Sequence, residues 1–120
     1  MNFEFLRDSW SELASLGGFA EQYCLSDPES SLVKMRAFAE RGMGIIYKEV
    51  GLPRAPKSNF MDLLSNDAFK SVMPKVVTDK FHAIRIHGNK AAHGEQCSVQ
   101  TSSSLHKETW DLGRWREYAD

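Results

Sequence analysis

Apolar residues recur every three or four positions along much of the chain, which is the spacing of an amphipathic α-helix. The clearest stretch lies between Asp27 and Gly51, where one apolar line contains Leu32, Met35, Ala39, Gly42, Ile46 and Val50. Ser26 or Asp27 can cap its start, and Pro28 suits its first turn. Gly51 suits the residue that follows the last turn. We therefore predict a long central helix over residues 28–50.

The N-terminal segment has the same spacing, carried by Phe3, Leu6, Trp10, Leu13 and Leu16 or Phe19. We predict a helix from about residue 3 to residue 24, with Asn2 as its cap. The consecutive glycines Gly17 and Gly18 lie inside it, so a kink or an interruption is expected there.

Shorter patterns follow the central helix. Two prolines punctuate residues 52–58 and predict a loop. A short helix is expected over residues 60–64, with Ser58 or Asn59 as its cap. A second short helix or turn is expected over residues 66–72.

The C-terminal third is more polar. Residues 95–104 are predicted to form a loop, and the serines and threonine at its end can cap a last helix. That helix holds Leu105, Trp110, Leu112 and Trp115. No strand pair is predicted, because Pro74 interrupts the β-branched run around it. The expected fold class is an all-α bundle of four or five helices.

A further helix is predicted between Pro74, which suits a first turn, and Gly94, which suits the residue after a last turn. One side of it carries Val77, Phe81, Ile84, Gly88 and Ala91 or Ala92. Gly88 costs about 1 kcal/mol relative to alanine inside a helix, so its presence predicts a close approach by another helix backbone. We expect the central helix to make this approach near Ala39, Gly42 or Gly44.

Beside that core side runs a polar stripe of His82, Arg85, Asn89 and His93. The last three are spaced i, i+4, i+8 and are therefore neighbours along one flank. In an enzyme, His93 could act as a general base and Arg85 could stabilise an anion such as phosphate. In a structural role, Asn89 and His93 would form interhelical hydrogen bonds, and Arg85 would pair with a carboxylate such as Glu40.

Composition limits the function classes. The chain has 120 residues, enough for one small domain, and 42% of them are hydrophobic. Fifteen Lys and Arg face sixteen Asp and Glu, so no global basic excess favours non-specific nucleic-acid binding. The sequence has neither an apolar run near 18 residues nor a signal-peptide pattern at its start. We expect a cytoplasmic chain without a membrane partner.

Metal and redox chemistry are not expected either. Cys24 and Cys97 are isolated in the sequence and are interpreted as free thiols. A zinc site is not predicted, because His82, His87 and His93 do not share one helix face and no cysteine pair assists them. The three tryptophans are interpreted as core or interface residues rather than as a base-stacking platform: Trp10, Trp110 and Trp115.

The most distinctive motif is the run Ile84-Arg-Ile-His-Gly-Asn-Lys-Ala-Ala-His-Gly94. Other stretches accompany it, namely Asn2-Phe-Glu-Phe-Leu6, Asp27-Pro28, the apolar and charged residues of 32–40, and Trp110-Asp-Leu-Gly-Arg-Trp115. Together they cover nearly the whole chain. This set resembles the HEPN-related helical domain found at the N-terminus of R subunits of type I restriction enzymes and related helicases.

The resemblance implies that residues 1–120 form a single HEPN-like helical domain that precedes nuclease and helicase domains in a longer restriction or helicase protein. The parent protein would be an ATP-dependent type I site-specific deoxyribonuclease subunit acting in DNA restriction. The implied partners are other domains or subunits of the restriction complex, with DNA reached indirectly; a homodimer is a further alternative. No cofactor is expected for the domain itself.

Catalytic HEPN ribonucleases carry an arginine, a polar residue, three variable residues and a histidine. Asn89 and His93 match the last two positions, but Gly88 occupies the arginine position and Arg85 lies about one turn earlier. Loss of a charge that stabilises a transition state can cost several kcal/mol.

The resemblance therefore favours a non-catalytic interaction or regulatory domain, with Arg85, Gly88, Asn89 and His93 as a binding or structural motif. Two alternatives stay open. One is a metal-independent HEPN ribonuclease with catalytic Arg85, Asn89 and His93. The other is a module that binds nucleic acid directly.

Overall fold

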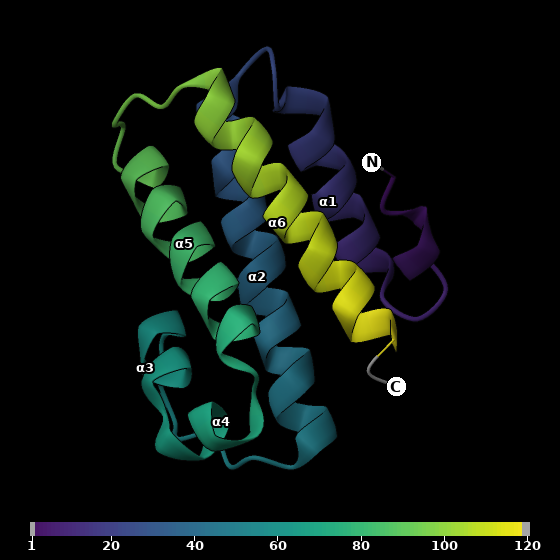
Figure 1. Ribbon diagram of the computed structural model, residues 1–120, viewed down its shortest axis with the longest axis vertical. Helices are drawn as coiled ribbons and strands as arrows, with labels where there is room; N and C mark the ends of the chain where they lie inside the picture. Colours follow the sequence, from purple (N-terminus) through teal and green to yellow (C-terminus); the bar gives the residue numbers. More distant parts are fainter. Residues whose placement is uncertain (1, 119–120) are drawn as a thin grey trace.

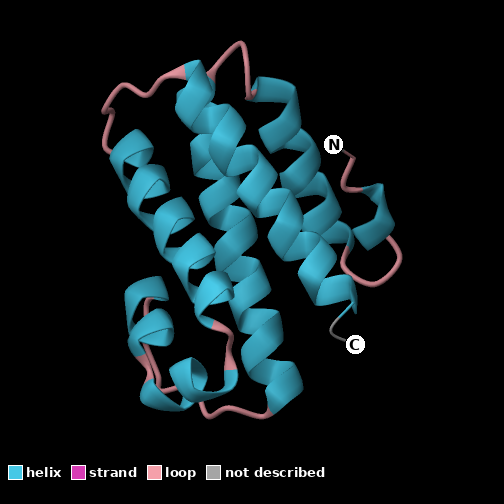
Figure 2. Cartoon of the chain, in the orientation of Figure 1, coloured by secondary structure: helices cyan, strands magenta, loops and turns pink. Residues whose placement is uncertain are grey.

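The computed structural model describes the backbone of residues 2–118 and the side chains of residues 2–115. Every regular element in this range is helical (Figure 2), so the predicted all-α class is confirmed. Six α-helices are present, rather than four or five, because both short segments after the central helix are helical. The elements are η1 (Glu4–Leu6), α1 (Ser11–Tyr23), α2 (Pro28–Val50), α3 (Phe60–Ser65), α4 (Asp67–Val72), α5 (Lys75–Ala92) and α6 (Val99–Tyr118).

The four long helices run alternately up and down, with α2 at the centre of the bundle (Figure 1). Helices α1, α5 and α6 all pack against α2. The short helices α3 and α4 lie at the end where α2 finishes and α5 begins. Among the described residues, no helix is long and apolar enough to cross a bilayer.

The predicted ends of the central helix are confirmed. Asp27 is its cap, with a side-chain oxygen that accepts a hydrogen bond from the Ser30 amide at 3.2 Å. Pro28 occupies the first turn, where its missing N–H has no helical partner to lose. Gly51 follows the last turn with a φ of +72°, in the left-handed region that favours glycine.

The N-terminal helix departs from its prediction. Residues 4–6 form a 3-10 turn, the chain then reverses, and α1 begins only at Ser11. The prediction that Asn2 caps a long first helix is wrong, because Phe3 is the residue before the 3-10 turn; the side-chain oxygen of Asn2 does accept a hydrogen bond from the Glu4 amide at 2.6 Å. Gly17 does not interrupt α1. It instead gives room to the ring of Phe3, whose atoms lie 2.3 Å from where a Cβ at position 17 would be.

Helix α6 starts earlier than predicted, inside the polar run. The Ser98 hydroxyl accepts from the Thr101 amide at 3.0 Å and caps the helix. Ser102 is fully buried, and its hydroxyl donates to the carbonyl of Cys24 at 2.6 Å. Hydrogen bonds of this kind allow small polar side chains to line a packed helix face, which hydrophobic spacing alone does not reveal.

The N-terminal turn is joined to α6 by a hydrogen bond and a ring contact. The indole N–H of Trp110 in α6 donates to the backbone carbonyl of Asn2 at 2.9 Å. Next to it, the ring of Phe3 meets the ring of His106 edge to face, with centroids 5.5 Å apart. The N-terminal turn is thus held by α6, more than one hundred residues later in the sequence.

The predicted core side of α5 is confirmed, because its apolar residues are buried: Val77, Phe81, Ile84, Gly88 and Ala91. Ala92, the alternative to Ala91, is exposed. Gly94 follows the helix with a φ of +83°, as expected for the residue after a last turn.

Candidate functional site

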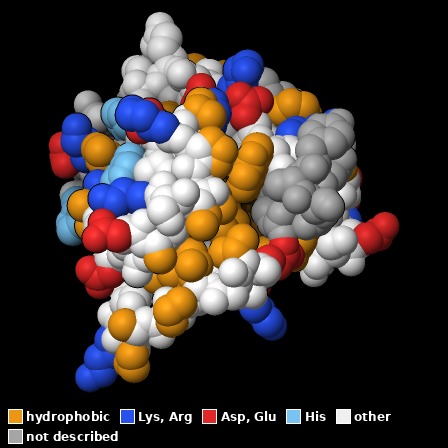
Figure 3. Space-filling view, turned by 60° about the horizontal axis from the view of Figure 1, so that its bottom comes forward, with side chains coloured by type: hydrophobic (Ala, Val, Ile, Leu, Met, Phe, Trp, Pro, Cys, Tyr) orange, Lys and Arg blue, Asp and Glu red, His pale blue; other side chains and the backbone are white. Residues whose placement is uncertain are grey.

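The polar stripe of α5 lies at the edge of the packed region. The side chains of His82, Arg85 and Asn89 are half-buried, and His93 is exposed at the C-terminal end of the helix. Figure 3 shows histidine side chains gathered with Lys and Arg on one edge of the molecule. His82 and His87 are in α5 and His93 directly follows it, whereas His106 in α6 is buried.

Within the described chain, no hydrogen bond or ion pair joins the side chains of Arg85, Asn89 or His93 to another residue. The interhelical hydrogen bonds expected for Asn89 and His93 are therefore not formed there. The expected pair between Arg85 and Glu40 is wrong, since Glu40 instead binds the guanidinium of Arg36 at 3.2 Å. The Nε of Arg85 is buried and has no acceptor among the described residues.

Gly88 lies at a close contact between α5 and α2. A Cβ at this position would lie 2.6 Å from the Cβ of Arg36, a separation that real Cβ atoms essentially never show. The predicted close approach by the central helix is confirmed, but the contact residue is Arg36 rather than Ala39, Gly42 or Gly44. An arginine side chain has no room at position 88 unless the two helices move apart.

The electrostatics of the stripe follow from its position. Burial lowers the pKa of His82, and the neighbouring positive charge of Arg85 lowers that pKa further. Asp79 acts in the opposite direction. Nothing in this arrangement orients His93 toward the guanidinium of Arg85, because His93 is exposed at the helix end whereas the Nε of Arg85 is buried. The stripe can offer hydrogen-bond donors to an anion, but it is not an assembled acid–base pair.

Metal binding is not supported by the described residues, which contain no group of three His, Cys, Asp or Glu side chains that could hold an ion. Cys24 is buried and Cys97 is half-buried, and both are free thiols as predicted. Burial raises the pKa of the Cys97 thiol, and the negative charges of Glu29 and Asp27 add to this shift.

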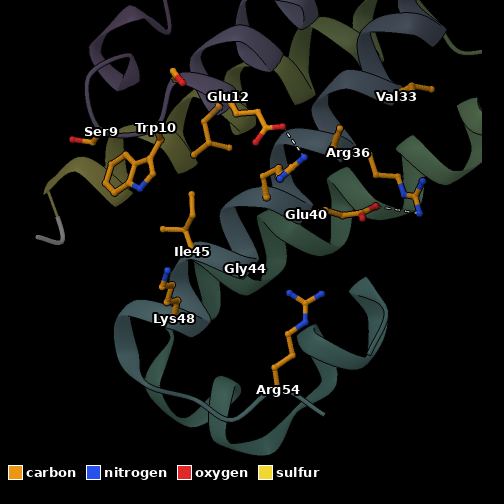
Figure 4. A pocket seen from close by; sticks show the side chains of 14 residues that line it. Ser9, Trp10, Glu12, Val33, Arg36, Glu40, Gly44, Ile45, Lys48 and Arg54 are labelled. Atoms are coloured by element: carbon orange, nitrogen blue, oxygen red, sulfur yellow. Dashed lines mark ion pairs between the residues drawn. The ribbon is translucent and has the colours of Figure 1, made fainter. Parts of the chain in front are cut away.

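Sequence reasoning missed a groove of about 760 Å³ on α2 (Figure 4). One face of α2 forms its floor, the start of α1 forms one wall, and Arg54 enters from the loop after α2. Two ion pairs lie along it, Arg36–Glu40 at 3.2 Å and Arg41–Glu12 at 2.6 Å. The only signal in the sequence is the recurrence of basic residues on the side of α2 that does not face the core.

A buried histidine was missed as well. His106 in α6 is only 7% exposed, and its Nε2 has no hydrogen-bond partner in the described chain. Burial lowers its pKa, and Glu21 partly opposes that shift. Its ring packs against Phe3, so His106 belongs to the packing of the N-terminal turn rather than to the α5 stripe.

Comparison of this chain with protein-family models, with curated proteins and with solved structures finds no match.

Proposed function

We propose that this chain is a non-catalytic helical interaction or regulatory domain of a type I restriction endonuclease R subunit. The proposal rests first on the resemblance carried by the run from Ile84 to Gly94 and by the stretches that accompany it. The all-α bundle with a long central helix agrees with a helical domain of this kind. Its partners would be other domains or subunits of the restriction complex, which would connect it to DNA.

The observation that carries the non-catalytic part of the proposal is the contact at Gly88. In the catalytic HEPN ribonucleases that this motif resembles, the position that corresponds to Gly88 holds an arginine. Here that position faces Arg36 of α2, and even a Cβ would stand 2.6 Å from the Cβ of that residue. The glycine is therefore a packing residue of the bundle, and a charge cannot be placed there without separating α5 from α2.

The alternative is a metal-independent ribonuclease that uses Arg85, Asn89 and His93. The observation in its favour is that Arg85 has no carboxylate partner among the described residues, so its charge is not neutralised by an ion pair. Against it, the Nε of Arg85 is buried, whereas His93 is exposed at the end of the helix. A proton-transfer site needs its groups within reach of one substrate atom.

A nuclease assay distinguishes these functions. Purified protein is incubated with end-labelled RNA, single-stranded DNA and double-stranded DNA, with and without magnesium. We expect no cleavage above that of a mock purification. Cleavage that persists through repurification and disappears in His93→Ala and in Arg85→Ala would establish the ribonuclease and overturn the proposal.

A further inference from the structure

The groove on α2 is a helix face that the bundle leaves uncovered. Its lining follows α2 at helical spacing from Val33 to Lys48, through Arg36, Ala37, Glu40, Arg41, Gly44 and Ile45. At 1.5 Å per residue, this face is about 22 Å long. That is the length of a helix of about 15 residues.

The uncharged half of this lining, which we call the floor of the groove, is apolar and partly small: Val33, Ala37, Gly44 and Ile45. Val33, a large hydrophobic residue, is 38% exposed at one end of the groove, and Ile45 and Trp10 are half-buried toward the other end (Figure 4). Ala37 and Gly44 have small side chains, so they leave space above the middle of the floor, and a Cβ at position 44 would touch only Arg54, at 3.5 Å. A second helix could therefore approach α2 closely along this line, as helices do where small residues face each other.

The rim of the groove is positively charged. Four cationic side chains stand against the two carboxylates of Glu12 and Glu40, and both carboxylates are already paired. Lys48 and Arg54 make no ion pair within the described residues. The whole chain has a formal net charge of −1, so this positive rim is a local feature. The Nε of Arg36 is buried at the rim and lacks a partner in the described chain.

From these observations we propose that the α2 groove binds an acidic amphipathic helix supplied by a protein partner. Apolar residues of that helix would lie on Val33, Ile45 and Trp10, and its flanking carboxylates would face Lys48 and Arg54. This mode of recognition uses anchors spaced as on one helix face. The inference rests on the proposed function as an interaction domain and names the surface and the chemistry of its partner.

Single-stranded nucleic acid fits the groove less well. Binding of a strand uses successive aromatic platforms and a continuous basic track. Trp10 is the one aromatic residue among the described residues that line the groove, and two of the four cations there are engaged in ion pairs. An apolar floor is better matched by aliphatic side chains than by phosphates.

The experiment uses a fluorescent peptide of about 18 residues, with leucines at helical spacing and glutamates on both flanks of the leucine stripe. Two matched probes carry lysines in place of the glutamates or the same residues in scrambled order. A single-stranded oligonucleotide is the fourth probe. We expect saturable binding of the acidic helix, and binding of the other three probes that is weaker by about tenfold or more.

The groove is tested with the double variant Lys48→Glu and Arg54→Glu. The matched control is Lys57→Glu with Lys90→Glu, because these lysines are exposed, lie outside the groove and produce the same change in net charge. The groove variant should bind the acidic peptide about tenfold more weakly, and the control should bind it as the unmodified protein does. All four positions are exposed, so both variants should keep the melting temperature of the unmodified protein.

If both variants lost the same affinity for the acidic peptide, the loss would be due to the change in net charge and not to the groove. That result would overturn the inference. So would the absence of peptide binding, or an oligonucleotide that binds more tightly than the peptide and depends on Lys48 and Arg54. The nuclease assay is independent of these outcomes. RNA cleavage would overturn the proposed function whether or not the peptide binds. If the peptide does not bind, the groove is not a docking surface, but the proposed function as an interaction domain is unaffected.

Discussion

Helix α2 is tightly packed on the side that faces α5 and open on the side that faces the groove. Toward α5 it lies so close that Gly88 leaves no space for a single carbon atom beside Arg36. Along the groove, Gly44 lies against an open face, and a Cβ there would meet only the tip of Arg54. A glycine inside a helix therefore indicates tight packing only where a neighbouring element crosses at the same level. One side holds the bundle together, and the other is the surface that we propose for a partner.

The largest expected effect comes from overfilling the tight side. Gly88→Leu adds a side chain where a Cβ alone would lie 2.6 Å from Arg36. We expect the free energy of unfolding to fall by about 1–3 kcal/mol or more, because a packed contact has to open. Chemical denaturation measures the change. Gly88→Leu with an unchanged denaturation midpoint would mean that the α2–α5 contact is not as close as described.

Filling space beside α2 should have the opposite sign. A Cβ at Gly42 has no heavy atom within 4 Å, so Gly42→Ala is free of clashes. Alanine is favoured over glycine inside a helix by about 1 kcal/mol. We expect thermal unfolding of this variant to occur at a higher temperature. Destabilisation by Gly42→Ala would contradict the open space around this glycine.

The burial of His106 predicts that the stability of the protein depends on pH. The pKa of His106 is lowered in the folded state by burial, so the unfolded state binds the proton more readily. Stability should therefore fall as the pH drops from the ordinary histidine pKa, about 6.5, toward the lowered value. His82 adds to the same trend.

Urea denaturation of the protein and of His106→Phe at pH 7.5 and at pH 5.5 tests this expectation. The substitution should reduce the loss of stability between the two pH values. His93→Ala is the matched control, because His93 is exposed. An equal pH dependence in the protein and in His106→Phe would show that His106 does not carry the effect.

The smallest effects are expected at the exposed end of the α5 stripe. The side chains of Asn89 and His93 make no hydrogen bond to another described residue, so removing them leaves no partner unsatisfied. Asn89→Ala and His93→Ala should each change the free energy of unfolding by less than about 0.5 kcal/mol. Calorimetry of both variants checks this. A cost of more than about 1 kcal/mol for Asn89→Ala would restore the interhelical role that the spacing had suggested.

The sequence predicted the parts of the fold that local chemistry determines. Asp27, Pro28 and Gly51 define the ends of α2, and the side of α5 that contains Gly88 was correctly assigned to the core. Caps and periodicity depend on neighbours within a few residues, which the sequence displays directly.

Features that depend on distant contacts were not predictable in this way. The N-terminal turn lies against α1 through the packing of Phe3 onto Gly17, fourteen positions later in the sequence. The polar start of α6 is helical because Ser102 finds the carbonyl of Cys24. The groove combines three segments, and only the fold brings Arg54 to the face of α2 that carries Lys48.

The hydrogen bond from Trp110 to the carbonyl of Asn2 has a consequence for synthesis. The N-terminal turn is made before α6, the helix that covers it, because more than one hundred residues separate the two in the sequence. Until α6 has emerged, Phe3 and Leu6 lack one side of the surroundings that bury them. Chains of this topology expose apolar surface during translation, when aggregation competes with folding. We expect this apolar surface to be accessible to chaperones until α6 has been made.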